Sequence, residues 1–145
     1  MSSNFERCIE DRKLVPFKAT SEMIEKEINS ASYDLTQAQN SYNNGDIKWA
    51  TIQGYCAMFH AVRALIYKRG YREKSHRCLL IALQESYVDT GLLSATYVDS
   101  FREAMDLRED ADYGFIYDSR SAKNIITAAK EFYTNVKKFL NKKAQ

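Results

Sequence analysis

Proline and glycine are scarce in this chain, since its 145 residues include 1 Pro and 5 Gly. These two residues are the usual interruptions of regular backbone, so their scarcity argues against a β fold with many tight turns and favours a few long helices. Long apolar runs are also missing. Because about 18 consecutive apolar residues are needed for a helix to cross a bilayer, no membrane-spanning segment is expected.

Cysteine is also scarce in this chain. Cys8, Cys56 and Cys78 form neither a C-x-x-C pair nor the spacing of a zinc site. The polar segment at residues 1–10 lacks the apolar core of a signal peptide. An odd number of cysteines without a secretory signal is typical of a reducing compartment. We therefore expect a cytoplasmic protein whose cysteines are thiols.

Histidine is rarer still. His60 and His76 are the 2 histidines, and neither has a cysteine or carboxylate at the spacing of metal ligands. The chain has no glycine-rich phosphate loop and no nucleophile elbow. We therefore expect no metal and no cofactor.

What the chain does contain is typical of an ordinary globular domain. It is 45% hydrophobic and 28% charged, and its net charge of +2 says little about partners. The length fits one domain. We expect an N-terminal arm at residues 1–19 without clear periodicity, a helical bundle at residues 20–141 and a frayed tail at residues 142–145.

Apolar residues recur at steps of three and four, which is the spacing of one helix face. The pattern predicts helices at about 21–42, 46–68, 75–87, 94–110 and 119–141. Their expected N-caps are Thr20 or Ser21, Asp46, Ser75 and Ser119. The segment 111–118 is expected to be a loop. Short connections between long helices imply antiparallel neighbours, so the expected fold is an all-α, up-and-down bundle.

The predicted helix at 46–68 is apolar on most sides. Such a helix is either central in the fold or shared with a second subunit. Its sequence is Trp49-Ala50-x3-Gly54-Tyr55-Cys56-Ala57-Met58-Phe59-His60-Ala61-x2-Ala64-Leu65. Lys74-Ser75-His76 follows the next turn, and Arg108-x2-Ala111-Asp112-Tyr113-Gly114 comes about thirty residues later. These segments occur in the same order in the HEPN domain family, and the chain resembles that family over residues 21–140. Within the family it resembles the short stand-alone members.

This resemblance implies a four-helix up-and-down bundle with an additional short helix, usually as a symmetric homodimer. Family members are often partners of a minimal nucleotidyltransferase, and such pairs can act as toxin and antitoxin. The active members are metal-independent ribonucleases, with an Arg followed after four to six residues by a His at the dimer cleft. In some pairs the transferase adenylylates a tyrosine just past this motif, which makes Tyr113 and Tyr117 candidate modification sites.

The histidine of that motif is missing from this chain. Arg108 matches the Arg, but four to six intervening residues lead to Tyr113, Gly114 and Phe115. RNA cleavage without a metal needs a base, an acid and a cation for the charged phosphorane. Arg108 can supply the cation. A tyrosine, whose ordinary pKa is about 10, is a poor base at neutral pH, although it can donate a hydrogen bond or stack on a nucleobase.

Two histidines elsewhere in the chain could replace the missing one. His76 follows an expected cap in a basic stretch, and His60 lies in the predicted helix 46–68; local hydrogen bonding is the alternative role for each. We take Arg108, Tyr113 and His76 as the candidate catalytic residues. The alternative is a structural role for both Arg108 and Tyr113. Arg108 would then form an ion pair near a helix end, and the Tyr113 ring would pack in the loop.

A basic cluster is the remaining candidate site. It comprises Lys68, Arg69, Arg72, Lys74 and Arg77, with Tyr67 and Tyr71 among them. Basic residues interleaved with aromatic ones can hold single-stranded RNA, and a solvated turn between helices is the alternative.

Three functions remain open at this point. The first is a HEPN-like partner of a nucleotidyltransferase that binds RNA or nucleotide without cutting it, and the missing motif histidine favours it. The second is a metal-independent ribonuclease toxin that uses Arg108 with a non-standard proton-transfer residue. The third is a helical scaffold without a small ligand.

Overall fold

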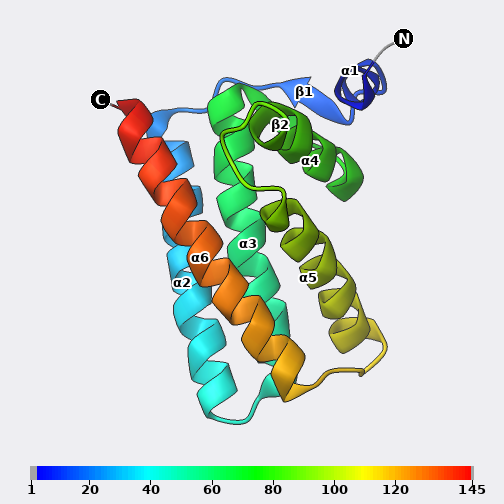
Figure 1. Ribbon diagram of the computed structural model, residues 1–145, viewed down its shortest axis with the longest axis vertical. Coiled ribbons are helices and arrows are strands. Elements are labelled where there is room, and N and C mark those ends of the chain that lie inside the picture. Colours follow the sequence, from blue (N-terminus) through cyan, green and yellow to red (C-terminus); the bar gives the residue numbers. More distant parts are fainter. Residues whose placement is uncertain (1–2, 145) are drawn as a thin grey trace.

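Four long helices form an up-and-down bundle in the computed structural model, which describes residues 3–144, with side chains through residue 141 (Figure 1). These helices are α2 (Ser21–Asn43), α3 (Ile47–Arg69), α5 (Thr96–Tyr113) and α6 (Ser119–Ala144). The short helix α4 (His76–Leu83) lies beside them and continues into a wider π-helical turn, η1 (Gln84–Val88). The predicted all-α bundle with an additional short helix is confirmed. None of the described helices is both long enough and apolar enough to span a membrane.

The first residues are more ordered than their sequence pattern indicates. The segment expected to be an arm contains helix α1 (Asn4–Glu10) and strand β1 (Leu14–Pro16). Strand β1 pairs antiparallel with β2 (Tyr71–Glu73), with Leu14 opposite Glu73. Three residues are too few for a periodic pattern, so this pairing is invisible in the sequence. It places the N-terminal segment across the end of the bundle where α3 ends and α4 begins (Figure 1).

A disulfide closes this end of the molecule. Cys8 of α1 is bonded to Cys78 of α4, at a sequence separation of 70 and with 5.8 Å between their Cα atoms. The expectation that all cysteines are thiols was therefore wrong for these two, and Cys56 is the free cysteine. The error has a physical source: spacing along the chain does not reveal that α1 folds back onto α4.

Helix α3 is central, which explains why it is apolar on most sides. It packs against α2, α5 and α6 within one chain. Its buried residues include Tyr55, Met58, Val62 and Leu65. Of the two explanations for its apolar surface, the central position therefore suffices, and no second subunit is needed to cover it.

Helix ends follow local hydrogen bonds. The Thr20 hydroxyl accepts from the Met23 N–H at 3.1 Å, and the Ser75 hydroxyl caps α4 in the same way, as predicted. Asp46 occupies the cap position of α3 without a side-chain hydrogen bond.

Two predicted boundaries near α6 were wrong. Helix α5 continues to Tyr113, because Ala111 is fully buried in the bundle and keeps this turn helical. The loop is therefore the shorter segment 114–118. Asp118, rather than Ser119, caps α6, since its Oδ1 accepts from the Ser121 N–H at 2.8 Å. At the other end α6 reaches Ala144, and Gln145 of the expected tail lies outside the described residues.

Candidate functional site

Arg108 lies one turn before the end of α5, with about a third of its side chain exposed. One charged partner is within reach: Nη2 lies 3.4 Å from Oδ2 of Asp112, one helical turn later. The Nε atom is buried and has no hydrogen-bond partner in the described structure. The exposed part of the guanidinium is therefore the part that a ligand could reach.

Two tyrosine rings flank this guanidinium. Its Cζ lies 5.4 Å from the ring centre of Tyr113 and 5.9 Å from that of Tyr55. Tyr113 is 69% exposed at the end of α5, whereas Tyr55 is 5% exposed and stacks on Phe101 with ring centres 5.8 Å apart. The site is therefore a cation between a solvent-facing ring and a buried one.

His76 contacts the same buried tyrosine. Its Nδ1 lies 3.5 Å from the Tyr55 hydroxyl oxygen, and its ring centre lies 5.5 Å from that of Phe59, one turn further along α3. His76 is the first residue of α4 and is exposed. The fold thus brings Arg108 and His76, thirty-two positions apart in sequence, to one tyrosine of α3.

Burial sets the protonation of the neighbouring groups. Burial raises the pKa of Tyr55 to about 12, while the Arg108 guanidinium opposes this shift. Burial also raises the pKa of the Cys56 thiol; the Asp34 carboxylate adds to this shift and Arg108 works against it. Both side chains therefore remain protonated at neutral pH.

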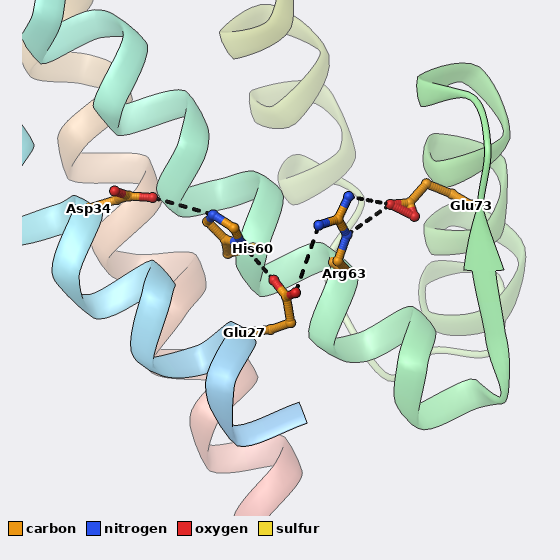
Figure 2. A network of polar contacts seen from close by, with 5 residues as sticks. All are labelled: Glu27, Asp34, His60, Arg63 and Glu73. Carbon is orange, nitrogen blue, oxygen red and sulfur yellow. Dashed lines mark hydrogen bonds and ion pairs between the residues drawn. The ribbon is translucent and has the colours of Figure 1, made fainter. Parts of the chain in front are cut away.

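His60, the other histidine, belongs to a separate polar network between α2 and α3 (Figure 2). Its Nδ1 lies 2.6 Å from Oε2 of Glu27, and its Nε2 lies 3.5 Å from Oδ2 of Asp34. On the same side of α3, Arg63 makes two 2.8 Å contacts to Oε1 of Glu73 (Figure 2). Both ring nitrogens of His60 are thus occupied by carboxylates of α2, which supports a role in joining the two helices.

The side chains of the predicted basic cluster have different neighbours. The guanidinium of Arg69 lies over the rings of Phe5 and Tyr71, and that of Arg72 lies over Phe17. Arg77 lines a groove of about 500 Å³ beside α5, together with Glu85, Arg102 and Asp106. Lys68 lines another groove, between α2 and α6. Two of the five basic side chains thus cover aromatic rings of the N-terminal segment or β2, while Lys68 and Arg77 lie in separate grooves.

The loop at residues 114–118, which follows α5, presents apolar side chains to solvent. Phe115, Ile116 and Tyr117 are 73%, 67% and 47% exposed, and Lys48 Nζ lies 4.8 Å from the Phe115 ring centre. The candidate modification sites Tyr113 and Tyr117 are both accessible here. Among the described residues, no group of three or more His, Cys, Asp or Glu side chains is arranged to hold a metal ion.

Sequence patterns do not single out Tyr55, Glu27 or Asp34. Tyr55 looks like one of several apolar positions on α3, and the available hint is that a buried tyrosine usually has a hydrogen-bond partner. The two acidic residues lie on a helix rich in charges. Only the packing of α2 and α4 against α3 distinguishes them from their neighbours.

Comparison with known proteins adds an independent observation. The HEPN domain family matches residues 24–139. A "UPF0332 protein" from Archaeoglobus fulgidus is 31% identical over 122 residues, which cover 82% of this chain and 96% of that protein. Two proteins of Methanocaldococcus jannaschii, "Putative toxin MJ0142" and "Putative toxin MJ0605", are 26% and 27% identical over 81% and 82% of this chain and 81% and 90% of their own lengths.

Proposed function

Because the chain belongs to the HEPN domain family, we propose that it is the toxin-like component of a two-component system and binds RNA through Arg108. Its partner in this proposal is a minimal nucleotidyltransferase. Two relatives carry the word toxin in their names, which supports the first part. The second part is carried by one observation: the partly exposed Arg108 guanidinium lies 5.4 Å from the centre of the exposed Tyr113 ring.

This arrangement suits a nucleotide strand. A guanidinium can donate two parallel hydrogen bonds to a phosphate, and an exposed aromatic ring can stack on an unpaired base. Asp112 forms an ion pair with Arg108 at 3.4 Å. A phosphate must either displace this carboxylate or bind beside it. Since the pair is partly solvated, its strength is about 1 kcal/mol or less, which one phosphate contact can replace.

Tyr113 and Tyr117 are the proposed targets of the transferase. In an adenylylation, the tyrosine oxygen attacks the α-phosphate of ATP, pyrophosphate leaves, and the hydroxyl proton passes to a base of the transferase. A nucleotide on Tyr113 would place a negative charge next to Arg108, which would compete with RNA for the guanidinium. A small nucleotidyltransferase gene next to the gene of this chain would support the partner, and its absence would weaken it.

RNA cleavage is the second candidate function. The observation in its favour is that His76 and Arg108 both contact Tyr55, so a histidine lies near the cation although the motif histidine is missing. His60, by contrast, is engaged with Glu27 and Asp34.

One experiment addresses both functions. Labelled single-stranded RNA is incubated with the full chain in a metal chelator, and both bound RNA and cleaved RNA are measured. Arg108→Ala is expected to weaken RNA binding about tenfold, the equivalent of about 1.4 kcal/mol. Arg102→Ala is the matched control, since Arg102 lies on the same helix, is more exposed and pairs with Asp99.

Equal RNA binding by the Arg108 and Arg102 variants would contradict an RNA site at Arg108. Cleavage that disappears with Arg108→Ala would favour the ribonuclease over the binding protein. Cleavage that persists in this variant would indicate a contaminating nuclease and would count against this site.

A further inference from the structure

Tyr55 is the residue through which Arg108 and His76 are connected. It comes from the central helix α3, and its side chain is almost completely buried. The Arg108 guanidinium lies over its ring, while His76 Nδ1 lies 3.5 Å from its hydroxyl oxygen. A contact of this length is at the outer limit of hydrogen bonding, and contacts in ligand-free sites commonly tighten when the ligand binds.

In this contact the Tyr55 hydroxyl can donate to His76 Nδ1 or accept from it, depending on the tautomer of His76. Burial raises the pKa of Tyr55 to about 12, so the hydroxyl keeps its proton at neutral pH. A buried hydroxyl hydrogen needs an acceptor, and His76 Nδ1 is the hydrogen-bond partner that the described structure provides. A neutral imidazole carries one hydrogen, so when Nδ1 accepts, that hydrogen is on Nε2.

We infer that Tyr55 is a positioning residue that makes His76 a hydrogen-bond donor, and that Arg108 and His76 together hold the phosphate groups of an RNA strand. This inference rests on the proposed RNA-binding function. The same hydrogen bond bears on whether His76 can act as a base. A general base needs a free nitrogen lone pair, and Tyr55 occupies the one on Nδ1. The site therefore contains two donors suited to phosphate, and His76 in this state does not provide the base for the 2′-hydroxyl.

Phe59 supports the same arrangement. Its ring packs against His76 on one side, and the Arg63 guanidinium lies 4.4 Å from its centre. Arg63 also holds Glu73, the last residue of β2, which is three positions before His76. The start of α4 is thus held to α3 by Tyr55 and Phe59 directly and by Arg63 through Glu73, which limits the orientations open to the His76 ring.

The tautomer of His76 tests the positioning role directly. The full chain is labelled with ¹⁵N in its histidine rings, and long-range ¹H–¹⁵N spectra are recorded about two pH units above the ordinary histidine pKa of ~6.5. His76 is expected to carry its hydrogen on Nε2 in the wild type and to become a mixture of tautomers in Tyr55→Phe. His60 is the internal control, because Glu27 holds its Nδ1 in both proteins.

An Nδ1–H tautomer of His76 in the wild type would overturn the inference. So would a tautomer that does not change in a folded Tyr55→Phe variant. If this variant does not fold, an Nδ1–H tautomer in the wild type still overturns the inference, since a donating Tyr55 requires Nε2–H.

RNA binding tests the donor role of His76 itself. Glutamine can place an N–H where Nε2 of histidine lies, so His76→Gln is expected to bind labelled single-stranded RNA within about threefold of the wild type. His76→Ala is expected to bind about tenfold more weakly. Equal losses in the two variants would overturn the donor role, and a response of the His76 signals to inorganic phosphate but not to RNA would overturn the choice of ligand.

Two measurements together separate the role of Tyr55 from RNA binding by Arg108. If Arg108→Ala leaves RNA binding unchanged, the proposed function is wrong, whatever the tautomer of His76. If Arg108→Ala weakens binding but His76 carries its hydrogen on Nδ1, the RNA site stands and the role of Tyr55 is wrong.

Discussion

Single polar side chains decide where the helices of this protein begin. Thr20 and Asp118 each accept a hydrogen bond from the backbone N–H three residues later, at 3.1 and 2.8 Å. Asp118 also accepts from the Ser121 hydroxyl. These bonds from Ser121 hold the pKa of Asp118 below its ordinary value. The cap of α6 is thus a charged group whose strength depends on pH, whereas the cap of α2 is neutral.

Acid should weaken the cap of α6 selectively. Since the pKa of Asp118 is lower in the folded state, its contribution to stability is present above the ordinary value of 3.8 and is lost as the pH falls through the folded pKa. The melting temperature of Asp118→Ala should therefore lie below that of the wild type at neutral pH, and the difference should shrink below about pH 4.

Thr20→Ala is the matched control for this effect. It removes a cap without a titratable group, so it should cost about 1 kcal/mol at every pH. A melting-temperature difference for Asp118→Ala that is equally large at low and neutral pH would contradict a charged cap.

At the scale of elements, the contact between α3 and α6 depends on a missing side chain. Gly54 lies in the middle of α3, and a Cβ atom added there would come within 2.7 Å of Cγ2 of Ile125 on α6. Glycine normally weakens a helix interior. Its presence here is explained by the close approach of the two helices.

Gly54→Ala should therefore destabilise the bundle. Overpacking typically costs about 1–3 kcal/mol, of which the better helix propensity of alanine recovers up to about 1 kcal/mol. Urea denaturation measures the change in the free energy of unfolding. Adding Ile125→Ala, which removes Cγ2, should relieve part of the clash, so the two losses should not add.

Ile125→Val serves as the control for this pair of changes, because it shortens the side chain but keeps Cγ2. It should give no relief in the Gly54→Ala background. Strict additivity of Gly54→Ala and Ile125→Ala would show that the two helices do not meet at this point.

At the scale of the whole molecule, the N-terminal segment is tied to the bundle by a covalent bond and a short sheet. The Cys8–Cys78 disulfide joins α1 to α4, and β1 pairs with β2 immediately before α4. This end of the fold also carries His76, so the cross-link supports the element that presents one half of the candidate site. The homodimer stays a prediction that rests on family resemblance.

Unfolded, unreduced protein should therefore expose one titratable thiol, that of Cys56, whereas reduced protein should expose three. Closing a loop of about 70 residues stabilises a fold by about 4 kcal/mol in the chain-entropy treatment. Reduction or Cys8→Ser should lower the free energy of unfolding by an amount of this order, and Cys56→Ser should not remove the cross-link. Three reactive thiols in the unreduced protein would show that the bond does not form.

Local sequence patterns suffice to place the long helices and to identify Arg108 as a candidate functional residue. Periodicity places the long helices to within a few residues, because the apolar residues of one helix face recur at short, regular steps. Thr20 and Ser75 cap their helices by accepting a hydrogen bond from the backbone N–H three residues later. Arg108 stands out as a cation next to Tyr113, without help from the fold.

The partners of these residues follow from the packing of the helices and are not visible in the sequence. Arg108 and His76 share Tyr55, His60 is held by Glu27, and Cys8 reaches Cys78, through contacts that join distant parts of the chain. Such contacts depend on how helices pack, and helix periodicity specifies which face is buried without specifying its neighbour. The shortened loop after Tyr113 has the same cause, since burial of Ala111 extended α5 beyond its local signals.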